Sequence, residues 1–380
     1  MNKTLHKLEN IEFLRVLFII FILVHHFGAF AVNILSYNTP IQPSFALSQL
    51  KDMQDNALHC VDFFLIIAGF FLVYTFNKSI SFCNFAKKKI LRLWPLIPVV
   101  TLSYFIFSIF HLVEFTPYYD ILSLFFLNNM GLTLNLGNNP QLWYVSSLFW
   151  GYLFYFYIIK NYEKKNVDLF VALLTFFCYA FLFHADNQHF GHHVQSFNYV
   201  FNAGFMRALG GMGIGYFIGN WFVTRENNCR KDVSIVSKLI YTAAEGYLLV
   251  FLTNNLIFHH SSNVTPVILV FFFSLLFILF LLQRGYISQS LNKPKFSTIG
   301  KYTYTIFIIH FAILVPFVLL INSQLPLNIL ALNKLYLVQS TYIFFCITLG
   351  VLTYHLIEAP ISAKLKKVLF NKNEETESST

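Results

Sequence analysis

Arg15 and His26 stand eleven residues apart in an otherwise apolar segment, IEFLRVLFIIFILVHHFG. Eleven residues make three helical turns with a rise of about 16 Å, so a helix would carry both side chains on one face. A guanidinium binds anionic groups, and an imidazole exchanges protons near neutral pH. The pair therefore predicts an anion site below and proton-transfer chemistry above. The alternative is that Arg15 extends to lipid headgroups while His25 and His26 mark the outer interface.

A second group of cations lies in the run KKKILRLWP, residues 87–95. Lys89 and Arg92 are three residues apart and so become neighbours on a helix. Together with Lys88 they are suited to holding phosphates, which predicts a binding site for a phosphorylated donor. An ordinary cluster of cations that anchors the cytoplasmic end of a span is the competing interpretation.

Five further residues are candidate substrate-binding residues because polar groups inside a membrane are costly and often functional. They are Trp143, Ser146, Arg207, His310 and Glu358. Each has a structural alternative: an aromatic belt for Trp143, a buried structural histidine for His310 and a solvated carboxylate for Glu358. The glycines that follow Arg207 predict close helix packing.

Neither a metal site nor a disulfide framework is expected. His184, His189, His192 and His193 crowd one segment, but their spacing fits no standard zinc signature. The five cysteines are odd in number and scattered, which favours buried, unpaired thiols.

The composition restricts which elements can position these residues. Of the 380 residues 57% are hydrophobic, 19% aromatic and only 11% charged. A soluble domain has about 25% charged residues, so the chain is predicted to be an all-α, polytopic membrane helical bundle. The net charge of +9 is not by itself a sign of nucleic-acid binding, and none is expected.

About ten membrane spans are predicted. Their ranges are 13–33, 59–76, 93–112, 143–160, 168–184, 204–222, 239–258, 264–283, 303–323 and 336–357. The short apolar run 121–127 is expected to be re-entrant or interfacial. One membrane domain spans residues 1–370, and the polar tail 371–380 is expected to be disordered.

Lysine and arginine alternate strongly between successive connections. All of them except Lys51, Arg207 and Lys334 fall on one side of the predicted membrane. Because cytoplasmic connections carry the excess of cations, both termini are expected to be cytoplasmic. The N-terminal segment is expected to stay uncleaved, since its apolar stretch continues past the signal-peptidase-like sequence Ala29-Phe30-Ala31.

Taken in order, these motifs resemble the membrane-bound acyltransferase 3 family. The resemblance rests on the segment containing Arg15 and His26, on VDFFLIIAGFFL, KKKILRLWPL, LWYVSS and RALGGMGIGYFIG, and on GKYTYTIFIIH with YHLIEAP. It covers about residues 9–361. Four positions depart from the common pattern, namely Ala68, Lys89, Leu148 and Ala359.

The resemblance implies a bacterial inner-membrane enzyme without a bound cofactor. Such an enzyme takes an acyl group, commonly acetyl, from cytoplasmic acyl-CoA and transfers it to a hydroxyl of an extracytoplasmic glycan such as lipopolysaccharide. His26 would be the general base or a transient acyl carrier, assisted by Arg15, and Lys89, Arg92 and Arg15 would bind acyl-CoA. The acceptor and the oligomeric state stay open. A glycan exporter or lipid-linked sugar flippase is the alternative function, in which the same polar residues would line a path.

Overall fold

The structure is a computed structural model of the chain. It describes residues 8–38, 45–128, 130, 132, 139–185, 196–197, 201–229, 233–258, 266–324, 327 and 330–370. Residues 371–380, and with them the predicted disordered tail, lie outside the described residues, as do His189, His192 and His193.

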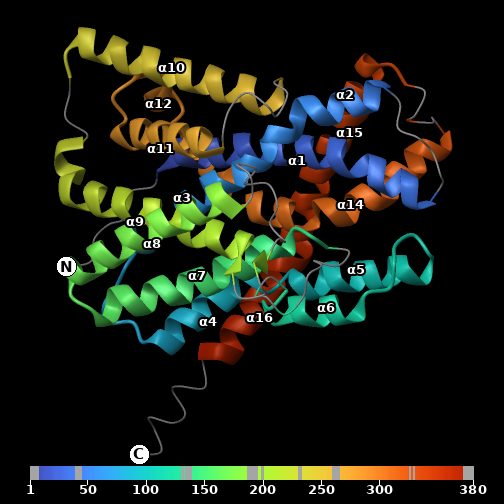
Figure 1. The fold of residues 1–380 in the computed structure, drawn as a ribbon, viewed down its shortest axis with the longest axis horizontal. Helices are drawn as coiled ribbons and strands as arrows, with labels where there is room; N and C mark the ends of the chain where they lie inside the picture. Colours follow the sequence, from blue (N-terminus) through green and yellow to red (C-terminus); the bar gives the residue numbers. More distant parts are fainter. Residues whose placement is uncertain are drawn as a thin grey trace, which may run out of the picture.

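The described chain is almost entirely helical (Figure 1). The helices are α1 Glu9–Asn38, α2 Phe45–Gln54, α3 Cys60–Tyr74, α4 Phe82–Leu93, α5 Ile97–Ile109, α6 Pro117–Leu124, α7 Leu142–Asn161, α8 Lys164–Ala185, α9 Ala203–Cys229, α10 Ile235–Ile257, α11 Pro266–Leu282, α12 Tyr286–Ser290, α13 Pro294–Gly300, α14 Thr303–Gln324, α15 Leu332–Thr353 and α16 Ala359–Phe370. A 3₁₀ turn at Asp55–His59 precedes α3, and a π-helical turn at Tyr354–Glu358 joins α15 to α16. Two short strands, β1 Ser196–Phe197 and β2 Phe201–Asn202, pair antiparallel.

Long apolar helices confirm the all-α, polytopic membrane bundle. Among the described residues seven helices are long and apolar enough to cross a membrane, and the count rises to eight if α4 and α5, bent by 42°, form one span. Two further predicted spans, 204–222 and 264–283, coincide largely with α9 and α11. The number ten and the cytoplasmic placement of both termini stay predictions. The run 121–127 is divided between the end of α6 and the turn that follows it.

Helix α1 lies at the centre of the bundle, where α3, α11, α13, α14 and α15 pack around it (Figure 1). Its core side chains, such as Leu14, Phe18 and Ile22, are almost fully buried because these helices pack against them. Helix α10 lies at the periphery, and its exposed Leu239, Ile240 and Val250 suit contact with lipid. The position of α1 makes the polar groups that it carries interior groups.

Helices α3 and α9 pack backbone to backbone, as the glycines of α9 predict. A Cβ atom on Gly215 would lie 2.0 Å from the carbonyl oxygen of Ile66, and one on Gly69 would lie 2.0 Å from that of Met212. Side chains at these positions would force the helices apart. Small residues thus allow the close approach that is typical of membrane helix pairs.

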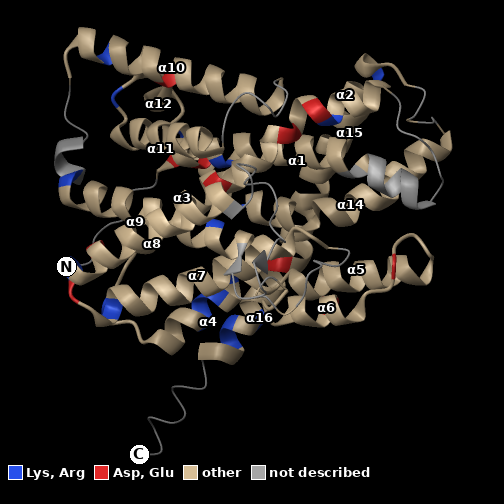
Figure 2. Cartoon of the chain, viewed as in Figure 1, with Lys and Arg blue, Asp and Glu red and all other residues tan. Residues whose placement is uncertain are grey.

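Lysine and arginine are unevenly distributed over the bundle (Figure 2). Most blue segments lie on the left of the view or along α4 and α16, whereas the right-hand end, near α2 and the start of α15, carries few. This distribution agrees with the alternation along the sequence. The lysine and arginine residues of α4 and α16 form the basic surface nearest to the cavity described next.

Candidate active site

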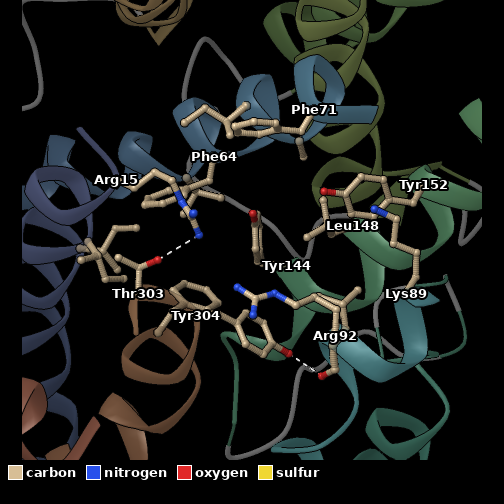
Figure 3. A pocket seen from close by; sticks show the side chains of 17 residues that line it. Arg15, Phe64, Phe71, Lys89, Arg92, Tyr144, Leu148, Tyr152, Thr303 and Tyr304 are labelled. Atoms are coloured by element: carbon tan, nitrogen blue, oxygen red, sulfur yellow. Dashed lines mark hydrogen bonds between the residues drawn. The ribbon is translucent and has the colours of Figure 1, made fainter. Parts of the chain in front are cut away.

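A cavity of about 270 Å³ opens between α1, α3, α4, α7 and the start of α14 (Figure 3). Arg15, Lys89 and Arg92 line it, so the structure brings together the cations of two motifs that lie more than seventy residues apart. The remaining lining is of two kinds. Hydroxyl groups come from Tyr144, Tyr152, Thr303 and Tyr304, and apolar side chains come from Ile19, Ile22, Val61, Phe64, Ile67, Ala68, Phe71, Leu93, Leu148 and Phe307.

Arg15 is held in position by two neighbours. Its Nη1 donates to both carboxylate oxygens of Glu12, at 2.9 and 2.8 Å, and its Nη2 donates to Thr303 Oγ1 at 3.0 Å. Glu12 lies directly against Gly300, where an added Cβ would fall 2.1 Å from Glu12 Oε2. Gly300 thus leaves space for the carboxylate, and the carboxylate orients the guanidinium toward the cavity.

Arg92 and Lys89 approach the cavity from α4. The Arg92 guanidinium is half-exposed, lies 5.5 Å from the centre of the Tyr304 ring, and has Nη1 3.8 Å from Glu358 Oε1. Lys89 Nζ lies 3.5 Å from the centre of the Tyr152 ring. Figure 3 shows Arg15 and Arg92 extending into the same part of the cavity, with Tyr144 beside them.

The cavity therefore carries an excess of positive charge. Two carboxylates, Glu12 and Glu358, accompany the three cations, and no described carboxylate lies within ion-pair distance of Lys89. Glu358 is also bound by the Thr305 hydroxyl, which donates to its Oε2, so part of its hydrogen-bonding capacity is used away from Arg92. A partly enclosed site with unbalanced cations binds anions, phosphates in particular.

His26 and His310 form a hydrogen-bonded pair. His26 Nδ1 lies 2.7 Å from His310 Nε2, and the two ring planes are nearly parallel, at 13° to each other. His310 Nδ1 lies 2.5 Å from the backbone oxygen of Phe307. A carbonyl only accepts, so His310 Nδ1 carries the proton and, in the neutral ring, Nε2 accepts from His26 Nδ1. In neutral His26 the lone pair is then on Nε2, the form that a general base or nucleophile needs.

The histidine pair lies one helical turn beyond the cavity. Ile22 and Phe307 line the cavity, and His26 and His310 follow them by four and three residues on α1 and α14. Phe311 packs against both imidazoles, with its ring centre 4.8 Å from that of His26 and 4.9 Å from that of His310. Arg15 and His26 thus belong to one continuous stripe of α1, with the cavity along its lower part.

Arg207 lies in a different environment from the cavity. Its Nε and Nη2 donate to Asp62 at 3.0 and 2.8 Å, and both side chains are essentially buried. Trp143 covers this ion pair, with its ring centre 5.6 Å from the guanidinium carbon. The sequence interpretation omitted Asp62, although a lone carboxylate in the apolar run VDFFLIIAGFFL was a signal for it.

Ser146 contacts a backbone group. Its hydroxyl donates to the carbonyl oxygen of Phe126 at 2.5 Å, and Trp150 Nε1 donates to the same oxygen at 2.9 Å. These bonds attach the turn after α6 to α7. Substrate binding by Trp143, Ser146, Arg207, His310 and Glu358 stays a prediction.

The hydroxyl-bearing cavity residues that were not site candidates come from α7 and α14. Tyr144 suggested only an aromatic belt with Trp143, and Tyr152, Thr303 and Tyr304 did not stand out because hydroxyl-bearing residues are common in membrane helices. For Thr303 and Tyr304 the available signal was their place in the motif GKYTYTIFIIH. This motif also carries Gly300, which lies against Glu12, and His310, which bonds to His26, while Thr303 bonds to Arg15. Among the described residues no group of histidine, cysteine and carboxylate side chains is arranged to hold a metal ion.

Comparison with protein families finds a match to a model described as an acyltransferase domain, over residues 8–356. The chain belongs to the acyltransferase 3 family. Comparisons with curated proteins and with solved structures find no match. Membership makes the chain a membrane acyltransferase in general terms and confirms the resemblance drawn from its motifs.

The acyltransferase 3 motifs of this chain converge on one region. The first, third and last two motifs supply Arg15, Lys89, Thr303 and Glu358 around the cavity and its ion pairs. Three departures from the common family pattern, Ala68, Lys89 and Leu148, also line the cavity. Ala359 begins α16, next to Glu358.

Proposed function

We propose that this acyltransferase moves an acyl group, acetyl in the simplest case, from cytoplasmic acyl-CoA to a hydroxyl of an extracytoplasmic glycan. The observation that carries the proposal is the single stripe of α1 with Arg15 in a cationic cavity and His26 bonded to His310 one turn beyond it. A donor molecule with anionic phosphates at one end and a thioester at the other requires cations first and the reactive imidazole farther along the same path.

The cations support the binding of the donor phosphates. Lys89 and Arg92 extend from α4, which belongs to the basic surface of the bundle, and Arg15 lies deeper. A cavity of about 270 Å³ is at the small end of the range for ligand pockets, so it suits the pantetheine arm while the nucleotide stays at the surface. The apolar wall formed by Ile19, Ile22 and Phe64 suits that narrow chain.

Two chemical routes agree with the lone pair on His26 Nε2. In the direct route this nitrogen takes the proton of the acceptor hydroxyl, whose oxygen attacks the thioester carbon. The carbon–sulfur bond then breaks, and the thiolate of CoA takes the proton back from His26. In the covalent route Nε2 attacks the thioester carbon, the carbon–sulfur bond breaks, and the CoA thiolate takes the proton that the acyl-imidazolium gives up. The acceptor oxygen then attacks the acyl carbon, the bond from that carbon to Nε2 breaks, and the hydroxyl proton restores the neutral imidazole.

The decisive test uses the protein in proteoliposomes with radiolabelled acetyl-CoA and surface glycan extracted from the source cells. His26→Ala is expected to lower acyl transfer by at least about 100-fold, the usual contribution of a general base. His25→Gln is the matched control, because His25 lies beside His26 but its Nδ1 pairs with the backbone oxygen of Gln54. Transfer by His26→Ala at the wild-type rate excludes the proposal.

Omitting the acceptor separates the two chemical routes. Label that stays on the wild-type protein and is absent from His26→Ala indicates the acyl-imidazole route. Transport of glycan into the proteoliposomes without consumption of acetyl-CoA would instead favour a flippase or exporter.

The donor site has its own test. Arg92→Ala is expected to raise the KM for acetyl-CoA about tenfold or more, because a charge-assisted contact to phosphate is lost. Lys78→Ala serves as the control, since Lys78 is an exposed cation that precedes α4 and does not line the cavity. An unchanged KM in Arg92→Ala removes α4 from the donor site.

A further inference from the structure

Two buried amide side chains precede α7 with polar atoms that no partner satisfies. Asn139 and Gln141 are each 3% exposed. In the part of the chain that the structure describes, Asn139 Nδ2 and Oδ1 and Gln141 Oε1 have no hydrogen-bond partner. Buried polar groups are nearly always paired, so such atoms call for a specific explanation.

Some other buried amides of the bundle are paired. Gln339 Nε2 donates to the backbone oxygen of Val24 at 3.0 Å and to Gln54 Oε1 at 2.8 Å. Asn56 Nδ2 donates to the backbone oxygen of Asn255 at 3.1 Å. Asn128 Nδ2 and Asn220 Nδ2 are unpaired as well, but among the described buried amides only Asn139 leaves both of its side-chain polar atoms without a partner.

Gln141 connects this pair of amides to the helix that carries His310. Its Nε2 donates to the backbone oxygen of Ile308 at 3.1 Å, two residues before His310 on α14. Because a carboxamide is planar and rigid, this bond also places the unpaired Oε1 beside α14 near the level of the histidine pair. Tyr144, on the first turn of α7, likewise packs against Phe307 of α14, with ring centres 5.1 Å apart.

The unpaired atoms comprise one donor group and two acceptors. A ligand that satisfies them must both accept and donate, as the hydroxyl groups of a carbohydrate do. A phosphate or another anion would only accept and would leave Asn139 Oδ1 and Gln141 Oε1 unpaired. The chemistry of these atoms therefore differs from that of the cationic cavity.

We propose that Asn139 and Gln141 form the subsite that binds acceptor hydroxyl groups beside the His26–His310 pair. This inference rests on the proposed acyl transfer, since it assigns the acceptor side of the same reaction. The donor cavity and the amides then approach the imidazoles from two directions, and one hydroxyl of the bound carbohydrate faces His26. The unpaired amides are satisfied only when the acceptor is present.

The test compares Asn139→Leu with wild type in proteoliposomes supplied with radiolabelled acetyl-CoA and surface glycan from the source cells. Leucine branches at Cγ as asparagine does, but it carries two methyl groups in place of the polar atoms. We expect the KM for the glycan to rise about fivefold or more, while the KM for acetyl-CoA and the slow release of CoA without glycan stay unchanged. Asn139→Ser, which restores one hydroxyl, is expected to recover part of the affinity.

Thermal unfolding separates this role from a structural one. A buried amide without a partner destabilises the empty protein, so Asn139→Leu is expected to keep or raise the unfolding temperature while it loses acceptor affinity. Asn220→Ala is the matched control, because Asn220 Nδ2 is also unpaired but lies on α9 away from the histidine pair. We expect this control to keep the wild-type KM for the glycan.

The outcomes are distinct. Wild-type protein that neither transfers acetyl groups nor releases CoA overturns the proposed function itself. Wild-type transfer with an unchanged KM for the glycan in Asn139→Leu and Gln141→Leu overturns the subsite alone. A lower unfolding temperature together with a parallel loss of CoA release in both variants assigns these amides to folding and also overturns the subsite.

Discussion

His310 determines what His26 can do. A lone imidazole has two equivalent choices for its proton, but His310 Nδ1 must donate to the Phe307 carbonyl, and its Nε2 must then accept from His26. This order keeps the lone pair of His26 on Nε2 and holds the ring against rotation. In the proposed mechanism His310 is thus a positioning residue, since it acts through His26.

His310→Ala is expected to lower kcat about 100-fold and to leave the KM for acetyl-CoA close to wild type. The reason is that misorientation of a proton-transfer group affects the chemical step, whereas the cations of the donor cavity remain in position. Steady-state kinetics in proteoliposomes measure both constants. A changed KM with an unchanged kcat would contradict the positioning role.

At the scale of elements, the junction of α13 and α14 organises the donor cavity. Gly300 ends α13 beneath Glu12, Thr303 begins α14 at Arg15, and Tyr304 donates its hydroxyl hydrogen to the backbone oxygen of Leu93 on α4. Thr305 then binds Glu358 at the π-helical turn. Residues 300–305 thereby connect α1, α4 and the turn that precedes α16.

Gly300→Ala is expected to raise the KM for acetyl-CoA about tenfold. The new methyl group would overlap the Glu12 carboxylate, so Glu12 must move and Arg15 loses its orientation toward the cavity. Gly246→Ala is the control, because its added Cβ would make only an ordinary contact, 3.5 Å from Ile287 Cδ1. Equal KM values for the two variants would contradict the proposed packing effect.

The α3–α9 pair depends on a buried charge as well as on glycines. Asp62→Asn is expected to destabilise the protein by about 3–5 kcal/mol, because it leaves the Arg207 guanidinium buried without a counter-charge. The double variant Asp62→Leu with Arg207→Met, which removes both charges, is expected to recover most of that loss. Thermal unfolding in detergent measures the stability of both variants. An unfolding temperature of Asp62→Asn equal to that of wild type would show that the ion pair is dispensable for stability.

At the scale of the whole molecule, the distribution of cations predicts an orientation in the membrane. The connection that precedes α4 is expected to be cytoplasmic, together with the donor cavity beside it. This places acyl-CoA and the cationic cavity on the same side. The start of α7, with Asn139 and Gln141, then belongs to the opposite half of the bundle.

Cys83 reports this orientation directly. It is exposed at the start of α4, whereas Cys60, Cys178 and Cys346 are buried. A membrane-impermeant maleimide is expected to modify Cys83 in inside-out vesicles and to leave it unmodified in intact spheroplasts. The experiment uses a Cys229→Ser background, because the Cys229 side chain lies outside the described residues. Modification in intact spheroplasts would reverse the predicted topology.

The sequence by itself determined that this is a membrane protein, and it indicated the chemistry of the strongest motifs. A chain with so little charge lies in lipid, where helices satisfy the hydrogen bonds of its backbone. The eleven-residue spacing of Arg15 and His26 places both side chains on the same face of one helix. Lys89 and Arg92 were likewise identified from their spacing. Local periodicity carries this information, since it needs no knowledge of which helices pack together.

Only the tertiary structure decided which polar groups meet. The contacts of His26 with His310, of Arg207 with Asp62 and of Glu12 with Gly300 join residues that are 145 to 288 positions apart. In the sequence each of these residues is simply a polar side chain in an apolar segment, so the sequence alone does not distinguish their partners. Burial in lipid forces each to find a partner, and the packing of the bundle determines whether that partner is a counter-ion, a second imidazole or a substrate.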